Sequence, residues 1–499
     1  MNREKNFTRI ASREEPWDIV VIGGGATGVG CALDAASRGC EVLLLEKFDL
    51  GSGTSSRSTK LIHGGVRYLR EGDISLVREA LRERSIILKN APHAARKLEF
   101  IIPCYGLRDE LFYGIGLKVY DLLAGFHGIG GSKIISRAET IKRLPTVVQD
   151  GLSGGVVYTD GQFDDARLLI DMACEASRRG ACIVNYASVE SIAGSKESGF
   201  EVSFCDSETN AEYTVNAHSV INAAGIFCDE IRGIADNNTE PTTTYSQGIH
   251  VVLDKLFLPS DAAIMIPKTA DGRVLFCIPW LGHTLVGTTD TPVDSPSFDP
   301  QPMEAEIDFV LETAGKYLVE KPTRADILSS WAGIRPLIRT QANVATSKLS
   351  RGHELFIDPN GLVTITGGKW TTYRRMAEDA VNKAADIGGL ERRKCVTKDL
   401  AIPPPSIIAG EPLHPDLPYT TADIERAVRD EMARTVEDVL ARRTRLLPVD
   451  ASAVVGLSQM TADILGRELG RDAAWEAGQM ESFSASVAKY LPDGNANRD

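Results

Sequence analysis

The chain has 499 residues, of which 43% are hydrophobic and 25% charged, and it carries a net charge of −13. This is the composition of a soluble globular protein of two or three domains. An acidic chain is not expected to bind nucleic acid, and an anionic substrate would need a local cluster of cations. Nine scattered cysteines, with no C-x-x-C and no Cys/His cluster, predict reduced thiols in a cytosolic protein and no metal site. The polar N-terminus and the lack of any run of about 18 apolar residues predict neither a signal peptide nor a membrane span.

A dinucleotide-binding pattern begins at residue 18, in "DIVVIGGGATGVGCALDAASRGCEVLLLEK". An apolar strand leads into a glycine-rich turn and a helix of small residues, which Gly39 is expected to end in the left-handed conformation. A second apolar run ends at Glu46, 18 residues beyond the last glycine of the pattern. The glycines that fit G-x-G-x-x-G are Gly23, Gly25 and Gly28. The flanking strands, helix and acid make this a dinucleotide site, which the glycines alone would not establish.

Each residue of the pattern has a mechanical role. Gly23 allows a tight turn, Gly25 lets the backbone approach a pyrophosphate, and Gly28 lets helix and strand pack closely. The helix N-terminus offers N–H groups and a positive dipole end to the phosphates. Glu46 can accept hydrogen bonds from a ribose and would repel a 2′-phosphate. The pattern therefore predicts FAD or NAD and disfavours NADP.

Two distant segments help to decide between FAD and NAD. Residues 218–225, "HSVINAAG", form an apolar strand that either extends the same parallel sheet or belongs to another part of the core. Residues 362–376, "LVTITGGKWTTYRRM", predict a strand, paired glycines and a helix that Thr371 or Thr372 can cap. Such a helix start would stabilise the negative charge of a reduced flavin, although a plain strand–helix connection has the same pattern. This second segment favours FAD.

A third segment, "STKLIHGGVRYL" at 58–69, places a lysine, a histidine, an arginine and a tyrosine around two glycines. Alone it is either a charged turn or the floor of a site. With the segments above, the chain resembles the FAD-dependent, quinone-linked glycerol-3-phosphate dehydrogenases, from about residue 17 to 390 and from about 411 to the end. The matching stretches are "VVIGGGATGVG", "TSSRSTKLIHGGVRYL", "FDDARL", "GTTDTPV", "AGIRPL", "TGGKWTTYRRMAE" and "VEDVLARRTRL".

The resemblance implies an α/β protein, α+β overall. It would have an FAD domain of the glutathione-reductase and D-amino-acid-oxidase type, a substrate domain on an antiparallel sheet and a helical C-terminal domain. The implied boundaries are 17–105, 151–250 and 331–390 for the FAD domain, 106–150 and 251–330 for the substrate domain, and 391–499 for the helical domain. The proline-rich linker at 399–410 is shorter than expected for the family.

The implied reaction is oxidation of sn-glycerol 3-phosphate to dihydroxyacetone phosphate. Hydride would pass from C2 to flavin N5, and electrons to a membrane quinone. The implied protein is a cytoplasmic homodimer, attached peripherally to the inner face of the cytoplasmic membrane. The rivals are a glycerol-3-phosphate oxidase that uses oxygen, an amine or amino-acid oxidase of the same superfamily, and a non-enzymatic flavin-binding sensor or assembly factor.

On the substrate side, the resemblance makes Arg335, in "AGIRPL", the leading phosphate ligand, and its setting between glycine and proline predicts a stiff loop. Arg351 is a second cation, or a solvated surface residue. Lys369 can reach the flavin or the substrate. Arg67 and Tyr68 are placed near the substrate, with Tyr68 as a hydroxyl donor.

His250 is the candidate base, and a satisfied core histidine is its alternative. His63 competes for that role but is favoured as a flavin-side residue. Asp290 holds a flavin-site turn or forms an Asx-turn. The residues predicted to contact the cofactor are Gly23, Gly25, Gly28, Glu46, Thr54, Ser55, Ser58, Lys60, Leu61, His63, Gly64, Gly65, Gly225, Asp290, Gly367, Gly368, Lys369 and Thr371.

Two further segments carry helical patterns. Thr420 and Asp423 suggest a capping box before apolar positions that keep helical spacing to residue 440. The arginines that follow, Arg442, Arg443 and Arg445, are expected to be dipole and surface charge. Residues 111–126, "LFYGIGLKVYDLLAGF", predict either an interfacial helix on a membrane or a helix that covers the core or a dimer face.

Overall fold

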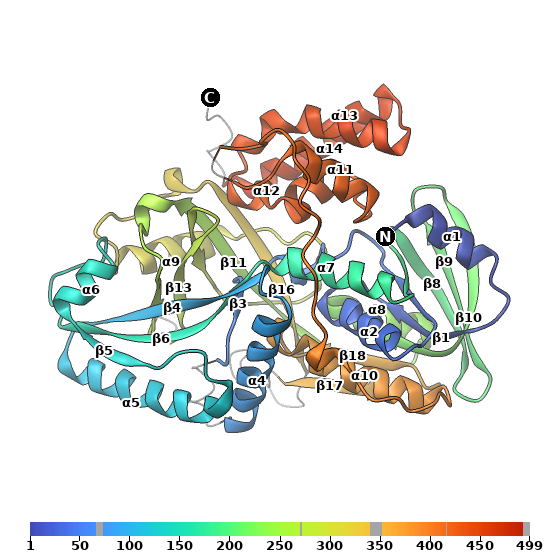
Figure 1. Cartoon of the computed structure of the whole chain (residues 1–499), viewed down its shortest axis with the longest axis horizontal. Helices are drawn as coiled ribbons and strands as arrows, with labels where there is room; N and C mark the ends of the chain where they lie inside the picture. The colour runs from blue at the N-terminus through green and yellow to red at the C-terminus, as the bar shows by residue number, and fades with distance from the viewer. Residues whose placement is uncertain (66–72, 270–271, 340–351, 416, 493–499) are drawn as a thin grey trace.

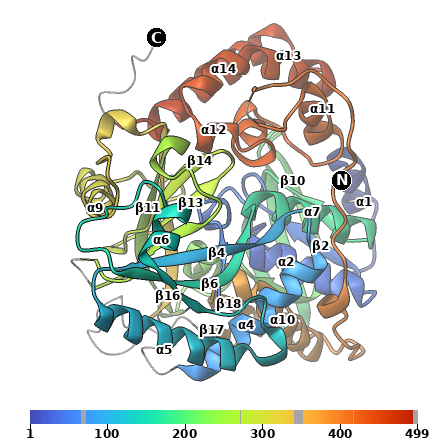
Figure 2. The same ribbon diagram turned by 60° about the vertical axis from the view of Figure 1, so that its left-hand side comes forward.

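The computed structural model describes residues 1–65, 73–269, 272–339, 352–415 and 417–492. Two β-sheets lie side by side, and the C-terminal helices lie above them in the orientation of Figure 1. Figure 2 shows the same helices across the top of the molecule, on the side away from α5 (Leu107–Ala124). The site described below lies where the two sheets meet.

The first sheet has a parallel centre. β1 (Trp17–Ile22) pairs in parallel with β2 (Val42–Leu45) and with β10 (Ala211–Asn222), and it is almost wholly buried, as a central parallel strand must be. The segment 218–225 therefore contributes a strand to the same sheet. The remaining strands are β18 (Val363–Gly367), β17 (His353–Ile357), β7 (Cys182–Val184), β8 (Ala187–Ser195) and β9 (Gly199–Asp206).

Helices cover both faces of this sheet. α2 (Ala26–Ser37), α7 (Asp165–Arg178) and α10 (Tyr373–Ile387) share one apolar core on one face. α1 (Arg3–Ala11) packs with the other face, and α8 (Cys228–Ala235) follows β10. The small residues of α2 allow close packing, and Gly39 ends this helix region with a φ of +81°, as predicted.

The second sheet is antiparallel except where β12 pairs with β4. Its path is β15 (Thr291–Val293), β11 (Thr243–Asp254), β14 (His283–Gly287), β13 (Leu275–Trp280), β12 (Ala263–Ile266), β4 (Ala95–Cys104), β6 (Gly154–Phe163) and β3 (Leu61–Ile62). β16 (Ser329–Ile338) pairs with β11, and β5 (Lys133–Ser136) with β6. The helices around it are α4 (Ile74–Asn90), α5, α6 (Arg137–Arg143) and α9 (Glu304–Gly315).

The predicted domain boundaries need correction at these strands. β4, β6, most of β11 and most of β16 fall in segments that were predicted for the FAD domain, yet they pair within the second sheet. The chain crosses between the sheets several times, and strand pairing is decided by distant partners that local pattern does not reveal.

The C-terminal region is helical, as predicted. Its helices are α11 (Thr421–Arg429), a π-helical turn (Asp438–Arg443), α12 (Leu446–Val449), α13 (Ser458–Leu469) and α14 (Ala473–Tyr490). The capping box of Thr420 and Asp423 is confirmed. The single helix predicted to residue 440 is wrong, because α11 ends at Arg429 and the chain turns at Met432 with a φ of +55°. The helices share a core with the second sheet, so they are built onto the substrate side of the molecule.

Candidate active site

A cavity of about 370 Å³ lies between the two sheets, within the size range of ligand pockets. One end is formed by the start of α2, at the carboxyl edge of the parallel sheet, where dinucleotides bind in folds of this kind. The other end is formed by β11 and β16 of the second sheet. The predicted site residues that line it are Gly25, Thr54, Ser55, Ser58, Leu61, His63, Gly65, Gly225, His250, Asp290, Arg335, Gly367, Gly368, Lys369 and Thr371.

The fingerprint glycines divide into one that faces the cavity and two that support it. Gly23 has a φ of +108°, and a Cβ there would lie 2.6 Å from the carbonyl oxygen of Ala223. A Cβ on Gly28 would collide with the carbonyl of Gly23. Gly25 is the extended N-cap residue of α2 and lines the cavity. This open backbone at a helix N-terminus fits the pyrophosphate of a dinucleotide.

Glu46 lies beside the fingerprint but not in the cavity wall. It follows β2, and its carboxylate accepts hydrogen bonds from the backbone N–H groups of Gly24 and Phe48. Glu46 therefore braces the turn between β1 and α2.

The two loop segments singled out in the sequence meet at the cavity. Trp370 Nε1 donates to the carbonyl of Ser55 at 2.9 Å, and the hydroxyl of Thr371 accepts from the backbone N–H of His63 at 3.3 Å. Thr372 is the N-cap residue of α10, one of the two positions predicted, but its side chain makes no capping hydrogen bond and donates to the carbonyl of Lys369. Thr371 joins the two loops.

Besides Gly23, Gly28 and Glu46, two further residues predicted for the cofactor side lie outside the cavity wall. Lys60 is fully buried, and its Nζ donates to the carbonyl of Ser56 at 2.6 Å and to Asp165 at 2.8 Å. Gly64 turns its N–H toward the hydroxyl of Tyr120, at 2.9 Å. Asp165 and Tyr120 are far away in the sequence, so the segment 58–69 gave no sign of these partners.

Arg335 lies on β16 and not on the stiff loop that was predicted. The register places it opposite Ser246 on β11, and its guanidinium lies over Gly248, where a Cβ would leave it no room. Its Nη atoms donate to the hydroxyl of Thr288 at 3.1 Å and to the carbonyl of Gln247 at 3.3 Å. A guanidinium laid flat in a cavity wall is well placed to bind an oxyanion.

Asp290 lies between two arginines. Its carboxylate is 3.6 Å from Arg335 Nη1 and 3.7 Å from Arg273 Nη1, and it accepts a hydrogen bond from Ser246. Arg273, which lines the cavity, was missed in the sequence, because nothing in "ADGRVLFC" distinguishes it from a surface arginine. Asp290 thus holds two guanidiniums together at one end of the cavity.

His250 lies on β11 and is 2% exposed. Its Nε2 is 2.9 Å from the hydroxyl of Thr59, and its ring stacks on Trp331 with centroids 5.6 Å apart. Burial lowers the pKa of His250 well below its ordinary value, and the charges of Lys60 and Arg335 lower it further. The imidazole is therefore neutral near pH 7 and can accept a proton.

Arg67, Tyr68 and Arg351 lie outside the described residues. Other cavity-lining side chains that were not predicted are Arg57, Thr59, Tyr158, Asp160, Thr288, Thr289 and Thr366. Asp160 is ion-paired with Arg84 at 2.8 Å and accepts from the hydroxyl of Tyr120, so it belongs to the wall. No group of three or more His, Cys, Asp or Glu side chains that could hold a metal ion occurs among the described residues.

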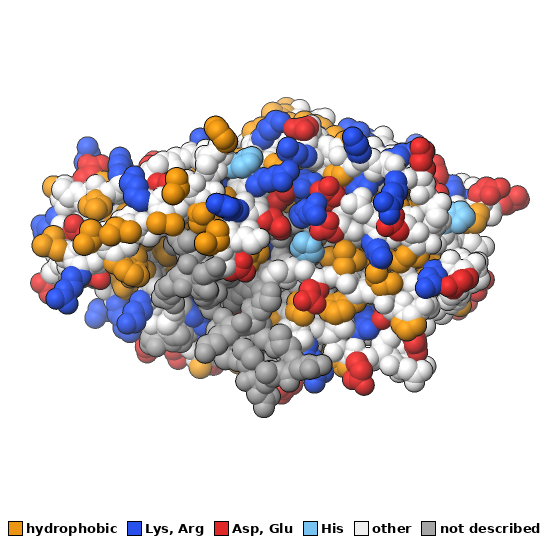
Figure 3. Space-filling view, turned by 90° about the horizontal axis from the view of Figure 1, so that it is seen from below, with side chains coloured by type: hydrophobic (Ala, Val, Ile, Leu, Met, Phe, Trp, Pro, Cys, Tyr) orange, Lys and Arg blue, Asp and Glu red, His pale blue; other side chains and the backbone are white. Residues whose placement is uncertain are grey.

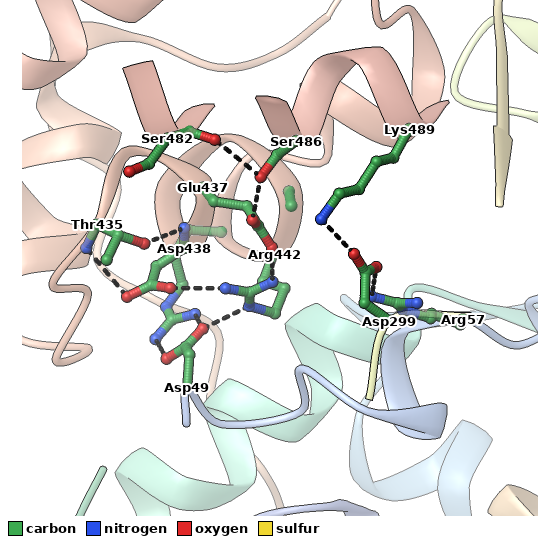
Figure 4. Close-up of polar contacts among 12 residues, drawn as sticks. Asp49, Arg57, Asp299, Thr435, Glu437, Asp438, Arg442, Ser482, Ser486 and Lys489 are labelled. Carbon is green, nitrogen blue, oxygen red and sulfur yellow. Dashed lines mark hydrogen bonds and ion pairs between the residues drawn. The ribbon is translucent and has the colours of Figure 1, made fainter. Parts of the chain in front are cut away.

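The arginines after the predicted C-terminal helix are buried and paired, which corrects their assignment to surface charge. Arg442 and Arg443 both bind the carboxylate of Asp49 in the FAD domain, with the closest contacts at 2.5 and 2.7 Å. Arg445 is 1% exposed and binds Asp165 at 3.1 Å. Figure 4 shows Asp49 and Arg442 facing each other, with Asp438 and Glu437 completing the cluster. Two of their acidic partners, Asp49 and Asp165, lie hundreds of residues earlier in the chain.

Comparisons with known proteins agree with this site. The profile of the FAD dependent oxidoreductase family matches residues 18–374, and that of the C-terminal domain of alpha-glycerophosphate oxidase matches residues 376–476. A mitochondrial glycerol-3-phosphate dehydrogenase of Arabidopsis thaliana is 37% identical, over 98% of this chain and 89% of that protein. The mitochondrial enzyme of Rattus norvegicus is also 37% identical, over 94% and 72%. The solved glycerol-3-phosphate dehydrogenase of Bacillus halodurans, complexed with FAD, is 26% identical with a TM-score of 0.78, covering 99% of this chain and 98% of that one.

The two-sheet fold, the glycine cradle and the family profile define an FAD-dependent oxidoreductase of the D-amino-acid-oxidase type, whose cofactor is FAD. The extent and degree of identity then narrow this class. The chain belongs to the FAD-dependent glycerol-3-phosphate dehydrogenase family. The resemblance noted in the sequence is thereby confirmed.

Proposed function

We propose that this protein oxidises sn-glycerol 3-phosphate to dihydroxyacetone phosphate and passes the electrons to a quinone. The observation that carries the proposal is the single cavity, which has a dinucleotide cradle at one end and two arginines around one aspartate at the other. A protein that only bound flavin would have no need of a second anion site. The names of the relatives support the same substrate.

Arg335 and Arg273 bind the phosphate of the substrate. Arg335 is held by Thr288 and by a backbone carbonyl, so its fork is oriented before the substrate arrives. Each charge-assisted hydrogen bond of this kind contributes about 1.5–3 kcal/mol. The two guanidiniums bring cations to the cavity wall, where a phosphate can bind although the whole chain is acidic.

His250 removes the proton from the C2 hydroxyl. Its imidazole is neutral and is fixed by Thr59 and Trp331, which leaves a nitrogen able to accept a proton. His63 keeps its flavin-side role, because its backbone is tied to Thr371 at the turn after β18.

FAD, when bound, supplies the acceptor for the hydride that leaves C2. Gly25 and the N-terminus of α2 would hold its pyrophosphate. Gly367, Gly368 and Lys369 line the cavity at the turn after β18 and would hold the ring end, where the positive charge of Lys369 favours the reduced flavin. These residues, and the loop at 54–65, also keep water from the reacting carbon.

Anaerobic mixing of the FAD-loaded protein with glycerol 3-phosphate tests the proposal. We expect the flavin absorbance to bleach with this substrate and not with glycerol or with small amino acids. Bleaching by an amino acid alone would assign the protein to the amino-acid oxidases. Peroxide yield against quinone reduction, measured in air with the same protein, separates the oxygen-using oxidase from the quinone-linked enzyme.

The outer face of α5 is the proposed contact with the membrane that holds the quinone. Its inner residues, such as Leu117 and Tyr120, are buried, while a row of apolar side chains points outward. Figure 3, which views the molecule from the side of α5, shows hydrophobic side chains gathered in its left half. The exposed members are Leu107, Leu111, Phe112, Ile115, Val119, Leu122 and Phe126. In the described residues no helix has the length and apolarity to cross a membrane, so contact would be in the plane of the surface.

Vesicle flotation tests this contact. Replacing Phe112 and Leu122 by serine should abolish binding to anionic phospholipid vesicles and leave flavin reduction unchanged. Ile407→Ser, at a still more exposed apolar residue of the linker, is the control and should bind as before. Unchanged flotation of the double variant, or its conversion from dimer to monomer without loss of flotation, would make the α5 face a protein interface instead. We place the protein at the inner face of the cytoplasmic membrane on the same argument.

A further inference from the structure

The C-terminal helical domain reaches the active site through one buried chain of contacts. Arg445, just before α12, has a left-handed backbone with a φ of +57° and is 1% exposed. Its Nη2 donates to the carbonyl of Ser56 and to the carboxylate of Asp165, both at 3.1 Å. Its Nη1 donates to the carbonyl of Ala441 at 2.8 Å, which fixes the guanidinium from its own side.

Asp165 connects Arg445 to the loop that carries Thr59. One carboxylate oxygen binds Arg445, and the other accepts from the hydroxyl of Ser58 at 2.7 Å and from Lys60 Nζ at 2.8 Å. Ser58 and Lys60 flank Thr59, whose hydroxyl is 2.9 Å from His250 Nε2. The position of this hydroxyl is therefore fixed from both sides of the loop by a carboxylate that the C-terminal domain holds.

The aromatic residues around Lys60 belong to the same arrangement. Lys60 Nζ lies 5.3 Å from the ring of Trp331 and 5.5 Å from that of Trp280, and Trp331 stacks on His250. The guanidinium of Arg445 lies 5.7 Å from Trp280. The lysine is thus held on aromatic faces beside the imidazole, and burial lowers its pKa to about 7.

We propose that Arg445 is a positioning residue for His250: through Asp165 it fixes the loop of Ser58, Thr59 and Lys60 against the imidazole. The proposal rests on the base role assigned to His250 above. Proton removal by His250 then depends on the correct packing of the C-terminal domain, which also contributes to stability. Neighbouring Arg442 and Arg443 bind Asp49, whose side chain also contacts Asn185 and, among the described residues, none of Ser58, Thr59 and Lys60; we therefore assign them to stability alone.

The charges around His250 predict the direction in which its pKa changes when the loop loosens. Lys60 faces it from the loop and Arg335 from β16, while Asp165 lies behind Lys60 and Asp290 behind Arg335. Thr59 and Trp331, which touch the ring, are uncharged. Loosening the loop moves Lys60 away and admits water, and both changes raise the pKa of His250 toward its ordinary value.

The test compares Arg445→Lys with Arg443→Lys, two buried arginines of one interface. Protein labelled with carbon-13 histidine is titrated by NMR, and the resonance of His250 among the eight histidines is identified with His250→Asn. We expect His250 to titrate at higher pH in Arg445→Lys than in the wild type and to be unchanged in Arg443→Lys. The rate of anaerobic flavin reduction should fall about tenfold or more in Arg445→Lys and less than twofold in Arg443→Lys.

Thr59→Val provides a second test that leaves the domain interface intact. It should lower the rate as Arg445→Lys does, and the double variant should be no slower than either, because both changes break one chain. An unchanged His250 titration in Arg445→Lys, an equal shift in Arg443→Lys, or a normal rate in Thr59→Val would each overturn the proposal. The NMR titration needs no substrate, so failure of the wild type to bleach with glycerol 3-phosphate would refute the proposed function separately.

Discussion

The arginines of the C-terminal interface and those of the cavity have different roles, although the side chain is the same. At the interface, Arg442 and Arg443 are buried and share Asp49, with further carboxylates close by. In the cavity, Arg335 is a quarter exposed and shares Asp290 with Arg273 at longer distances. Full burial among carboxylates makes the first group a structural link between the C-terminal helices and the rest of the chain. Partial exposure in a cavity wall gives Arg335 access to an anion.

The comparison teaches that burial and pairing, not residue type, separate structural from binding arginines. A buried guanidinium that loses its carboxylate partner destabilises the folded protein strongly, because the remaining charge is buried without compensation. A partly exposed guanidinium in a cavity wall retains capacity for a ligand. Substitutions at the interface cluster, in the cavity and at the surface test this distinction.

Asp49→Asn should have the largest effect. It leaves Arg442 and Arg443 buried without their shared carboxylate, at a cost of about 3–5 kcal/mol in the free energy of unfolding. Urea unfolding at saturating FAD measures this, and KM for glycerol 3-phosphate should stay within about twofold. A loss below about 1 kcal/mol would mean that the interface does not depend on this cluster.

The same carboxylate predicts acid sensitivity. Burial acts to raise the pKa of Asp49, but the guanidiniums of Arg443 and Arg442 outweigh it and hold the pKa below the ordinary value. The folded state therefore binds this proton less tightly than the unfolded state. Its contribution is present above about pH 4 and is lost as the pH falls through the folded pKa.

Arg335→Ala should raise KM for glycerol 3-phosphate by roughly 10- to 100-fold, because it removes a charge-assisted contact of about 1.5–3 kcal/mol. FAD should stay bound and the unfolding midpoint should change little. Arg57→Ala, which also lines the cavity but is paired with Asp299, is the matched variant and should change KM less. An unchanged KM in Arg335→Ala would remove Arg335 from the phosphate site.

The pH profile of flavin reduction should show a smaller effect. Because burial and the charges of Lys60 and Arg335 hold the pKa of His250 well below 6.5, the rate should stay constant as the pH falls through 6.5. It should decline only in more acid solution, where the imidazole becomes protonated. A half-maximal rate at or above pH 6.5 in stopped-flow experiments would contradict the neutral buried base.

Arg392→Ala should have the smallest effect. This arginine pairs with Asp386 at 2.7 Å, but its side chain is 81% exposed. Water screens such a pair, so no measurable change in the unfolding midpoint or in KM is expected. A clear loss of stability would show that exposure alone does not distinguish a surface arginine such as Arg392 from the arginines of the interface and of the cavity.

The parts of the site that follow from local backbone geometry were predictable. Gly23 and Gly28 are required by a turn and by a close helix–strand contact within a dozen residues, and the pattern expresses this directly. Lys60 was misplaced, because its partner Asp165 lies 105 residues away and draws the side chain out of the cavity wall.

The sequence by itself determined the dinucleotide cradle, the FAD cofactor and the family, because each depends on short segments whose residues act on their immediate neighbours. The tertiary structure decided which strands form the second sheet, which arginines are buried at the domain interface and which line the cavity, and that the C-terminal domain touches the catalytic loop. These features depend on charges and hydrogen bonds between residues hundreds of positions apart, such as Arg445 and Asp165. Local pattern does not encode such pairings, and only the folded chain brings the partners together.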